Sequence, residues 1–367
     1  MLLKTLKLKN FRNYENESFS YGAGINIIVG SNAQGKTNSA EAAFLLATGF
    51  SPRVKKDKQV IRYGEKEAEI SACAASKYGD LASTIKYFSD GKKKIFINGA
   101  ETKKVGELLG NINAVFFNPG ELKLVQESPE DRRRFMDVAL SQLEKRYFYS
   151  LSKYKKIILQ RNNLLKDGDK NMVLDTLPVW DEQLADYAVD IIEGRNEFLK
   201  RLAPLAKTAH AYITDEKEEL QVFSDEKFCG SREEIKSNFL SALNSSVERD
   251  IILGFTTVGP HRDDIKMTLG GVDVKSYCSQ GQQRTAALAL KLAELEIFKE
   301  KFGEYPVLIL DDAMSELDRF RQKKLLAYIC NVQTIITCTH VDDSVFAGAR
   351  YRLFEVNDGK IISQSDK

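Results

Sequence analysis

The sequence has little of the chemistry that disulfide-stapled, metal-bound or membrane proteins use. Its 367 residues include five cysteines with no C-x-x-C pair and three widely separated histidines, His210, His261 and His340. This usage argues against a disulfide framework, a zinc ribbon and a histidine-based metal site, and it fits a reducing cytosol. No apolar run approaches the length of a membrane-spanning helix, and the first residues alternate Leu and Lys rather than forming a signal peptide. We therefore expect a cytoplasmic protein with no membrane segment.

The chain also has little net charge. It carries 54 Lys and Arg against 52 Asp and Glu, a formal net charge of +2. This balance excludes a uniformly basic DNA-coating protein but leaves local basic patches open. An apolar fraction of 43% is typical of a globular chain. The length predicts two or three domains, and disordered, collagen-like or rod-like architectures are excluded for the chain as a whole.

The clearest motif follows a short apolar strand predicted over residues 25–29. Residues 30–37 read G-S-N-A-Q-G-K-T, and a helix is predicted over 38–47. Strand, glycine loop and helix are the context of a phosphate-binding loop, because glycines let successive N–H groups and a helix N-terminus point at phosphates. Lys36 would lie near the β- and γ-phosphates of ATP, and the Thr37 hydroxyl would ligate Mg²⁺. The predicted nucleotide-binding residues of this loop are Gly30, Ser31, Asn32, Ala33, Gln34, Gly35, Lys36 and Thr37.

A second buried strand, over residues 306–310, ends in Asp311 and Asp312. Beside a phosphate loop this is the Walker B arrangement. Asp311 would hold Mg²⁺ through water, and Asp312 would position or deprotonate the attacking water. About 270 residues separate the two halves of the site. The nucleotide domain is therefore predicted to be discontinuous, with a large insertion that compact kinases and small GTPases lack.

Residues 279–283 read S-Q-G-Q-Q and precede a predicted long helix. The free N–H groups of that helix, with Ser279 and Gly281, predict a second anion site, and Gln282 joins the predicted nucleotide-binding set. One ATP needs only one phosphate cradle, so this one is predicted to serve a nucleotide held by a second copy of the chain, across a two-fold axis. Gln283, and His340 after a final strand at 334–338, are further candidates for catalysis.

Taken in order, these motifs resemble the RecF family of ABC/SMC-type ATPases. The matching segments are residues 8–14, 30–38, 117–119, 132–135, 259–264, 279–284 and 311–318. The resemblance implies an α/β fold: an ABC-type P-loop ATPase head with a discontinuous nucleotide domain and an inserted, mostly helical lobe or arm. It also adds Arg12 to the nucleotide-binding set.

Within the insertion, apolar residues at helical spacing predict one helix over 138–166, a break at 167–170 and a second helix carrying apolar residues from 184 to 202. A capping-box pattern at Ser231 predicts a third. We interpret the first two as an antiparallel arm. The expected domains are lobe I, 1–115 with 285–367, and lobe II with its arm, 116–284.

The insertion carries most of the basic clustering. Residues 132–166 hold ten Lys or Arg against two acids, net +8. Such a stripe would track DNA phosphates without reading sequence, whereas the alternative is a solvated helix face. The DNA-binding candidates are Arg53, Lys55, Lys56, Arg132, Arg133, Arg134, Lys153, Lys155 and Lys156.

The resemblance implies an ATP-dependent homodimer that binds duplex DNA beside single-strand gaps and junctions. Its partners would be RecR and RecO, and indirectly RecA, in DNA repair, replication restart and the SOS response. A glutamate usually follows the Walker B aspartate in ABC-type ATPases, so the shorter Asp312 implies slow, DNA-dependent hydrolysis that serves a switch rather than a motor. A P-loop transferase, a transporter subunit and a structural ATP-binding partner without gap specificity remain the alternatives.

Overall fold

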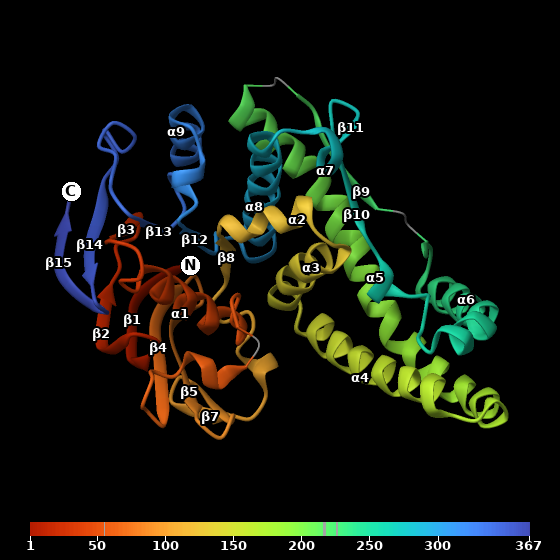
Figure 1. Cartoon of the computed structure of the whole chain (residues 1–367). Coiled ribbons are helices and arrows are strands. Elements are labelled where there is room, and N and C mark those ends of the chain that lie inside the picture. The colour runs from red at the N-terminus through yellow and green to blue at the C-terminus, as the bar shows by residue number, and fades with distance from the viewer. Residues whose placement is uncertain (55, 216–217, 225–226) are drawn as a thin grey trace.

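The computed structural model describes residues 1–54, 56–215, 218–224 and 227–367. A six-stranded sheet, in the order β15-β14-β3-β13-β12-β8, lies at the centre of the head (Figure 1). Its strands β14, β3, β13, β12 and β8 are parallel, and β15 pairs with β14 in the antiparallel sense. The strands are β3 (Ile25–Val29), β8 (Ala114–Phe117), β12 (Val307–Asp311), β13 (Thr334–Cys338), β14 (Tyr351–Asn357) and β15 (Lys360–Asp366).

A second, antiparallel sheet has the order β2-β1-β4-β5-β6-β7. Helix α1 (Lys36–Thr48) is buried between the two sheets and contacts both, which explains its Ala-rich sequence. The strands of this second sheet are β1 (Leu2–Phe11), β2 (Tyr14–Ser20), β4 (Glu67–Ser76), β5 (Gly79–Phe88), β6 (Lys93–Ile97) and β7 (Ala100–Thr102). The phosphate loop is thus fixed on both sides, by β3 before it and by a fully packed helix after it.

Side chains alternate across the central sheet. Ile28, Ile309 and Ile335 join the core around α1, whereas their neighbours Ile27 and Leu308 join the core of the inserted helices. A strand places successive side chains on opposite faces, so both faces are covered. These short apolar strands are therefore buried on both sides, as is usual for parallel sheets.

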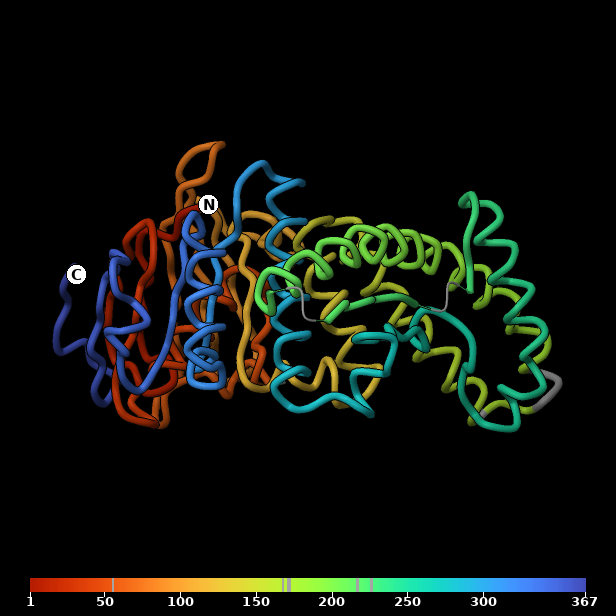
Figure 2. Tube along the Cα trace, turned by 90° about the horizontal axis from the view of Figure 1, so that it is seen from above, coloured from red at the N-terminus to blue at the C-terminus, as the bar shows by residue number. Residues whose placement is uncertain are grey.

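The insertion forms an arm. Helices α4 (Lys145–Asp167) and α5 (Lys170–Thr214) lie side by side and extend away from the sheets, and α6 (Arg232–Leu253) packs near their far end (Figures 1 and 2). The predicted break at 167–170 and the Ser231 capping box are confirmed. The remaining elements are α2 (Lys123–Gln126), α3 (Pro129–Leu143), β9 (Leu220–Ser224), β10 (Ile265–Leu269), β11 (Val272–Asp273), α7 (Val274–Tyr277), α8 (Gln280–Phe302) and α9 (Arg319–Tyr328), with short 3-10 turns η1 (Asp57–Val60), η2 (Val105–Glu107), η3 (Pro119–Leu122), η4 (Pro260–Arg262) and η5 (Met314–Glu316).

The prediction of one helix over 138–166 is wrong. The helix breaks at Glu144, whose backbone is extended, and the chain turns from α3 into α4 there. The apolar pattern runs straight through this turn, and no Gly or Pro marks it. Gln142 supplies the tertiary reason, because its side-chain amide accepts from the N–H of Ala114 at 3.0 Å and donates to its carbonyl at 3.2 Å. The end of α3 is thereby fixed to β8.

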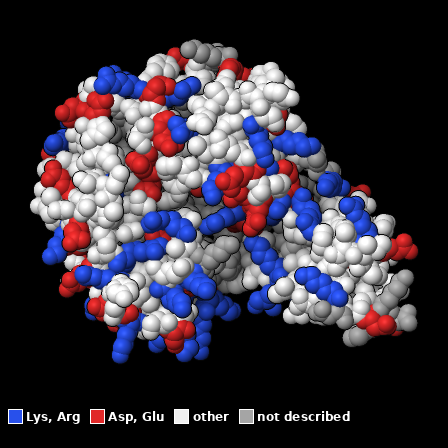
Figure 3. Space-filling model, in the orientation of Figure 1, with Lys and Arg blue, Asp and Glu red and all other residues white. Residues whose placement is uncertain are grey.

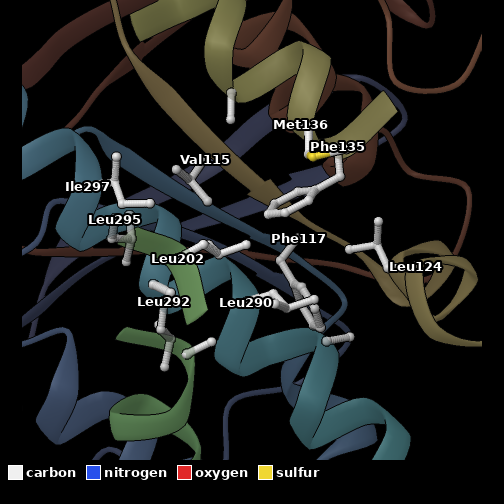
Figure 4. Packing of buried hydrophobic residues seen from close by; sticks show 14 of the residues in the cluster. Val115, Phe117, Leu124, Phe135, Met136, Leu202, Leu290, Leu292, Leu295 and Ile297 are labelled. Carbon is white, nitrogen blue, oxygen red and sulfur yellow. The ribbon is translucent and has the colours of Figure 1, made fainter. Parts of the chain in front are cut away.

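A mixed core joins the arm to the head. Phe135 and Met136 of α3 lie beside Phe117 of β8, and leucines of α8 and α5 fill the other side (Figure 4). The predicted lobe division stays a prediction, and β8 and α8 each cross one of its boundaries. No helix in the described part of the chain is long and apolar enough to cross a lipid bilayer.

A buried polar cluster at the base of the arm contains His261. Its Nδ1 lies 2.7 Å from the Tyr154 hydroxyl, and its Nε2 lies 3.0 Å from the Thr256 carbonyl. A carbonyl only accepts, so Nε2 carries the proton and Nδ1 accepts from Tyr154. Burial lowers the pKa of His261 from 6.5 to about 4, so the ring is neutral in the folded protein.

This pKa shift predicts a pH-dependent stability. Between pH 6.5 and about 4 the unfolded chain binds a proton at His261 that the folded chain does not. The free energy of unfolding should therefore fall as pH falls through that window, by up to about 3 kcal/mol from this residue. His261→Gln should lower stability near neutral pH but reduce that slope. Urea unfolding at several pH values measures both quantities. Equal slopes for wild type and His261→Gln would contradict the assignment.

Candidate functional site

The phosphate loop is held by residues from the first hairpin. The Tyr14 hydroxyl donates to the Gly35 carbonyl at 3.0 Å, and the Asn13 amide donates to the Gln34 carbonyl at 2.9 Å. Gly35 has φ +116, and a Cβ there would lie 2.8 Å from the Asn13 amide nitrogen. Both the conformation and the close approach require glycine at this position.

The far end of the chain closes over the same loop. Two backbone N–H groups at the tip of the β14–β15 hairpin donate to Gln34. The Asp358 N–H donates to the side-chain oxygen at 2.6 Å, and the Gly359 N–H donates to the backbone carbonyl at 3.0 Å. A Cβ at Gly30 would lie 2.3 Å from the Val356 carbonyl oxygen. The loop is therefore pre-shaped from two sides, which lowers the conformational cost of binding an anion.

The loop and the Walker B strand meet at Thr37 and Asp311. The Thr37 hydroxyl donates to the Asp311 carboxylate at 2.9 Å, across 274 residues of sequence. Lys36 Nζ donates to the carbonyls of Gly30 and Ser31 at 2.6 and 2.8 Å. The structure thus brings together four predicted site residues, Lys36, Thr37, Asp311 and Asp312.

Thr337 of β13 fixes both Walker B aspartates. Its hydroxyl donates to Asp311 at 2.7 Å, while the Asp312 N–H donates to the Thr337 carbonyl and hydroxyl at 3.1 and 3.0 Å. Asp312 has φ +53, a left-handed conformation that these two bonds hold. The Ser315 hydroxyl donates to the Asp312 carboxylate at 3.1 Å. The orientation of Asp312 is therefore fixed through its backbone and its side chain.

Burial raises the pKa of Asp311, and hydrogen bonds from Thr337 and Thr37 and the charge of Arg53 oppose this. Among the described residues Asp311 has no ion-pair partner within 4.0 Å. A buried carboxylate beside a threonine hydroxyl is a set of hard oxygen ligands, and Mg²⁺ is usually bound through one or two carboxylates plus phosphate oxygens. The residues present fit that ion.

Arg12 lies in the turn between β1 and β2, and its side chain contacts α1, the helix that follows the phosphate loop, rather than the loop itself. Its guanidinium binds both carboxylate oxygens of Glu41 at 3.0 and 2.7 Å. Glu41 is fully buried in α1 and also accepts from the Ser51 hydroxyl at 2.5 Å. Arg53, predicted as a DNA ligand, donates to Asn38 at 2.8 Å and lies 3.5 Å from Glu41. Both arginines therefore contact side chains of α1, the helix that follows the phosphate loop.

The residues of the predicted second anion site bond to elements other than the loop at 30–37. Ser279 caps α8, accepting from the Gln282 N–H, while the Gln282 side chain accepts from the Ser279 N–H. Gln283 is buried, where it accepts from Gln126 of α2 at 2.6 Å and donates to the carbonyls of Val274 and Lys275. In the described part of the chain, no hydrogen bond or ion pair joins 279–283 to 30–37.

The remaining candidates occupy different environments. His340 is exposed on the loop after β13, with Nδ1 at 3.2 Å from the Thr339 hydroxyl. Arg132 is buried and binds both carboxylate oxygens of Asp264 at 2.5 and 2.9 Å, so its charge is not available at the surface.

Arg133 donates to the Asp263 carbonyl at 2.6 Å, and Arg134 to the Ser51 carbonyl at 3.3 Å. Lys155 lies 3.4 Å from Asp137. The exposed lysines among the described candidates are Lys56, Lys153, Lys155 and Lys156, and of these Lys155 lies near a carboxylate. Lys55 lies outside the described residues.

Comparison with known proteins places this geometry in one family. The family described as RecF/RecN/SMC N terminal domain matches residues 2–361. The DNA replication and repair protein RecF of Clostridium kluyveri is 43% identical over 98% of this chain and 99% of its own length. That of Clostridium acetobutylicum is 42% identical over 98% and 99%.

The chain belongs to the RecF family. Two solved structures of the recombination mediator protein RecF, described as RecF-ATPrS and RecF-ATP in the RecFOR pathway, match with TM-scores of 0.89. They are 36% and 35% identical and cover 98% and 100% of this chain and 97% of theirs. An Smc head bound to the C-winged helix domain of ScpA is 16% identical over 100% and 98%, with a TM-score of 0.59. The predicted ABC/SMC-type ATPase head is thereby confirmed.

Several residues that shape the RecF site had no predicted role. They are Asn13, Tyr14, Glu41, Thr337, Asp358 and Gly359. Asn13 and Tyr14 do fall in the first motif that carries the resemblance, and Asp358-Gly359 is a turn signal. Neither signal indicates that these residues contact the phosphate loop. Glu41 and Thr337 carry no local signal, because their partners lie on other elements.

Proposed function

We propose that this chain is an ATP-gated recombination mediator that dimerises on DNA. One observation supports the proposal: Thr37 of the loop at 30–37 meets Asp311, whereas among the described residues no hydrogen bond or ion pair joins that loop to the capped start of α8, which we propose as a second anion site. A second copy, related by a two-fold axis, would bring Ser279 and Gly281 to the nucleotide on Lys36. The solved RecF-ATP relative supports ATP as that nucleotide.

Each residue of the site then has a defined task. Lys36 would leave the loop carbonyls and donate to the β- and γ-phosphates, and Thr37 and Asp311 would hold Mg²⁺. The metal would neutralise charge on the phosphates. Asp312, held by Thr337 and Ser315, would accept a proton from the attacking water. Hydrolysis would be slow and would release the dimer, so ATP acts as a switch.

Exposed basic side chains would bind DNA through its phosphates. Figure 3 shows Lys and Arg on both sides of the hollow between head and arm. Lys56, Lys153 and Lys156 are exposed and would contribute without reading sequence. We propose duplex DNA beside a single-strand gap as the ligand. The RecFOR pathway named for the solved relatives supports RecR and RecO as partners, with RecA loading in the cytoplasm as the outcome.

Sedimentation of the full-length chain tests the proposal. A dimer that forms with ATP but not ADP, and that gapped duplex strengthens, is the expected result. A monomer that ignores both ATP and DNA would refute it.

Ser279→Arg should weaken ATP-dependent dimerisation about 10- to 100-fold, because the long side chain would occupy the space where the partner's triphosphate docks. ATP binding to the monomer should stay near wild type. Nucleotide titration and sedimentation measure the two effects separately. Ser237→Arg, on an exposed face of α6, is the control. Normal dimerisation of Ser279→Arg would mean that the site is complete within one chain.

A further inference from the structure

A cavity of about 690 Å³ lies between the head and the base of the arm. Its apolar walls come from both sides, with Phe44, Phe50 and Val54 on the head and Val138, Phe148 and Leu151 on the arm. The residues of the phosphate loop do not line it. Its size and largely apolar lining are typical of a ligand-binding cavity, and nothing in the proposed ATP site uses it.

Two aromatic rings meet across this cavity. Phe50, which follows α1, and Phe148 of α4 have ring centroids 6.2 Å apart and planes inclined at 43°. Phe50 remains 47% exposed. Lys93 Nζ lies 5.4 Å from the centroid of the Phe50 ring, so a flat aromatic group would stack on the other face of Phe50 or on Phe148.

The lining of the same cavity includes two arginines that have no carboxylate partner among the described residues. Arg133 and Arg134 both line the cavity, and within the described ranges neither has a carboxylate within 4.0 Å. Their hydrogen bonds go to backbone carbonyls, of Asp263 and Ser51. Burial and the neighbouring Arg195 lower the pKa of Arg133. An anion in the cavity would relieve both effects.

The acidic residues of the cavity do not neutralise this pair. Asp137 is already bound by Arg195 at 2.8 Å and by the Tyr147 hydroxyl at 2.6 Å. Asp57 is paired with Lys93 at 3.0 Å. Glu130 is the third acid and is exposed. The lining of the cavity therefore combines aromatic rings with two planar cations that no carboxylate of the described residues pairs within 4.0 Å, and these groups match the base and the phosphate of a nucleotide.

We propose that this cavity binds one nucleoside phosphate, with its base against Phe50 and Phe148 and its phosphate on Arg133 and Arg134. The inference rests on the DNA-binding role proposed above and refines it. The same chemistry is offered by an unpaired residue of a DNA strand and by a free mononucleotide. Binding of an unpaired nucleotide in the cavity would explain how a protein that contacts only DNA phosphates distinguishes gapped DNA from intact duplex.

A single-tryptophan reporter tests the proposal. Trp180 is the one tryptophan of the chain. In a Trp180→Phe, Phe148→Trp double variant, a base that enters the cavity should quench the fluorescence by stacking on the new indole. The probes are a short thymidine oligonucleotide, thymidine monophosphate and a blunt duplex, each added without ATP, and ATP alone is titrated separately. Saturable quenching by the oligonucleotide or the monophosphate supports the proposal and identifies the source. No quenching by either, or equal quenching by the blunt duplex, overturns it.

Charge variants of the reporter protein add a second readout. Arg133→Gln or Arg134→Gln should weaken binding of the quenching probe about tenfold. Arg134 is exposed, so its variant remains informative if Arg133→Gln fails to fold. Lys200→Gln, an exposed cation of α5 outside the cavity, should bind the probe as the reporter does. Unchanged affinity in both arginine variants overturns the proposal. If the reporter stays silent while ATP still drives dimerisation on gapped duplex, the inference fails and the proposed function stands.

Discussion

Asp312→Asn should slow ATP hydrolysis by at least about 100-fold, the usual contribution of a positioned proton acceptor. The amide has the size of the carboxylate but cannot take a proton. Asn also tolerates the left-handed backbone that Asp312 adopts at φ +53, so the turn held by Thr337 should persist. Asp311 keeps its contact with Thr37. ATP binding should therefore stay near wild type, and the ATP-bound dimer should remain on gapped duplex longer.

Single-turnover phosphate release measures the chemical step, and dissociation from gapped duplex after an ATP chase measures the lifetime of the dimer. Asp343→Asn, exposed on the loop after β13, is the matched control and should leave both rates unchanged. Wild-type hydrolysis by Asp312→Asn would exclude this residue as the water-positioning group. His340, on the same loop, would then be the first candidate. Gln283 would come second, because hydrogen bonds hold its side chain among α2 and α7.

Lys36→Ala should weaken ATP binding about 10- to 100-fold, because it removes charge-assisted hydrogen bonds to the phosphates. Lys36→Arg should keep more affinity, since the charge remains, but should hydrolyse poorly because the planar guanidinium is bulkier than the ammonium. Direct titration with a fluorescent ATP analogue gives the affinities, and phosphate release gives the rates.

Lys36 also donates to the Gly30 and Ser31 carbonyls, so the variants must be checked for loop integrity. Equal thermal unfolding midpoints for wild type and variants would separate lost phosphate contacts from a distorted loop. Lys92→Ala, exposed in the turn between β5 and β6, is the control for removal of a surface lysine. ATP hydrolysis at the wild-type rate in Lys36→Ala would refute the phosphate-loop assignment.

The strands and loops that surround the nucleotide site were predictable because their signals are local. The apolar run at 25–29 is β3, and the run that ends at Asp311 is β12. Glycine at position 35 indicates a positive φ, which glycine adopts without strain. Ser279 indicates the start of a helix, because its side chain caps the first turn. In each case the interactions that matter lie within a few residues of one another.

The arm shows where such signals end. Apolar spacing continues from α3 into α4, so the sequence suggests one helix, and only the contact between Gln142 and β8 breaks it. The same limit applies to the basic run. Arg132 reads as part of a DNA-binding stripe, yet Asp264, far along the chain, neutralises and buries it. Charge in the sequence predicts surface charge only when no distant carboxylate is in reach.

The sequence by itself determined the family, the strand and helix on either side of the glycine loop at 30–37, the strand that ends at Asp311, and the long insertion between them. It did so because each depends on residue types at fixed short spacing. Only the tertiary structure decided which residues hold that loop and which cations are free. Tyr14 and Gly359, from opposite ends of the chain, donate hydrogen bonds to carbonyls of the loop. Glu41 forms an ion pair with Arg12. These contacts follow from how two sheets enclose α1, and no local pattern encodes that packing.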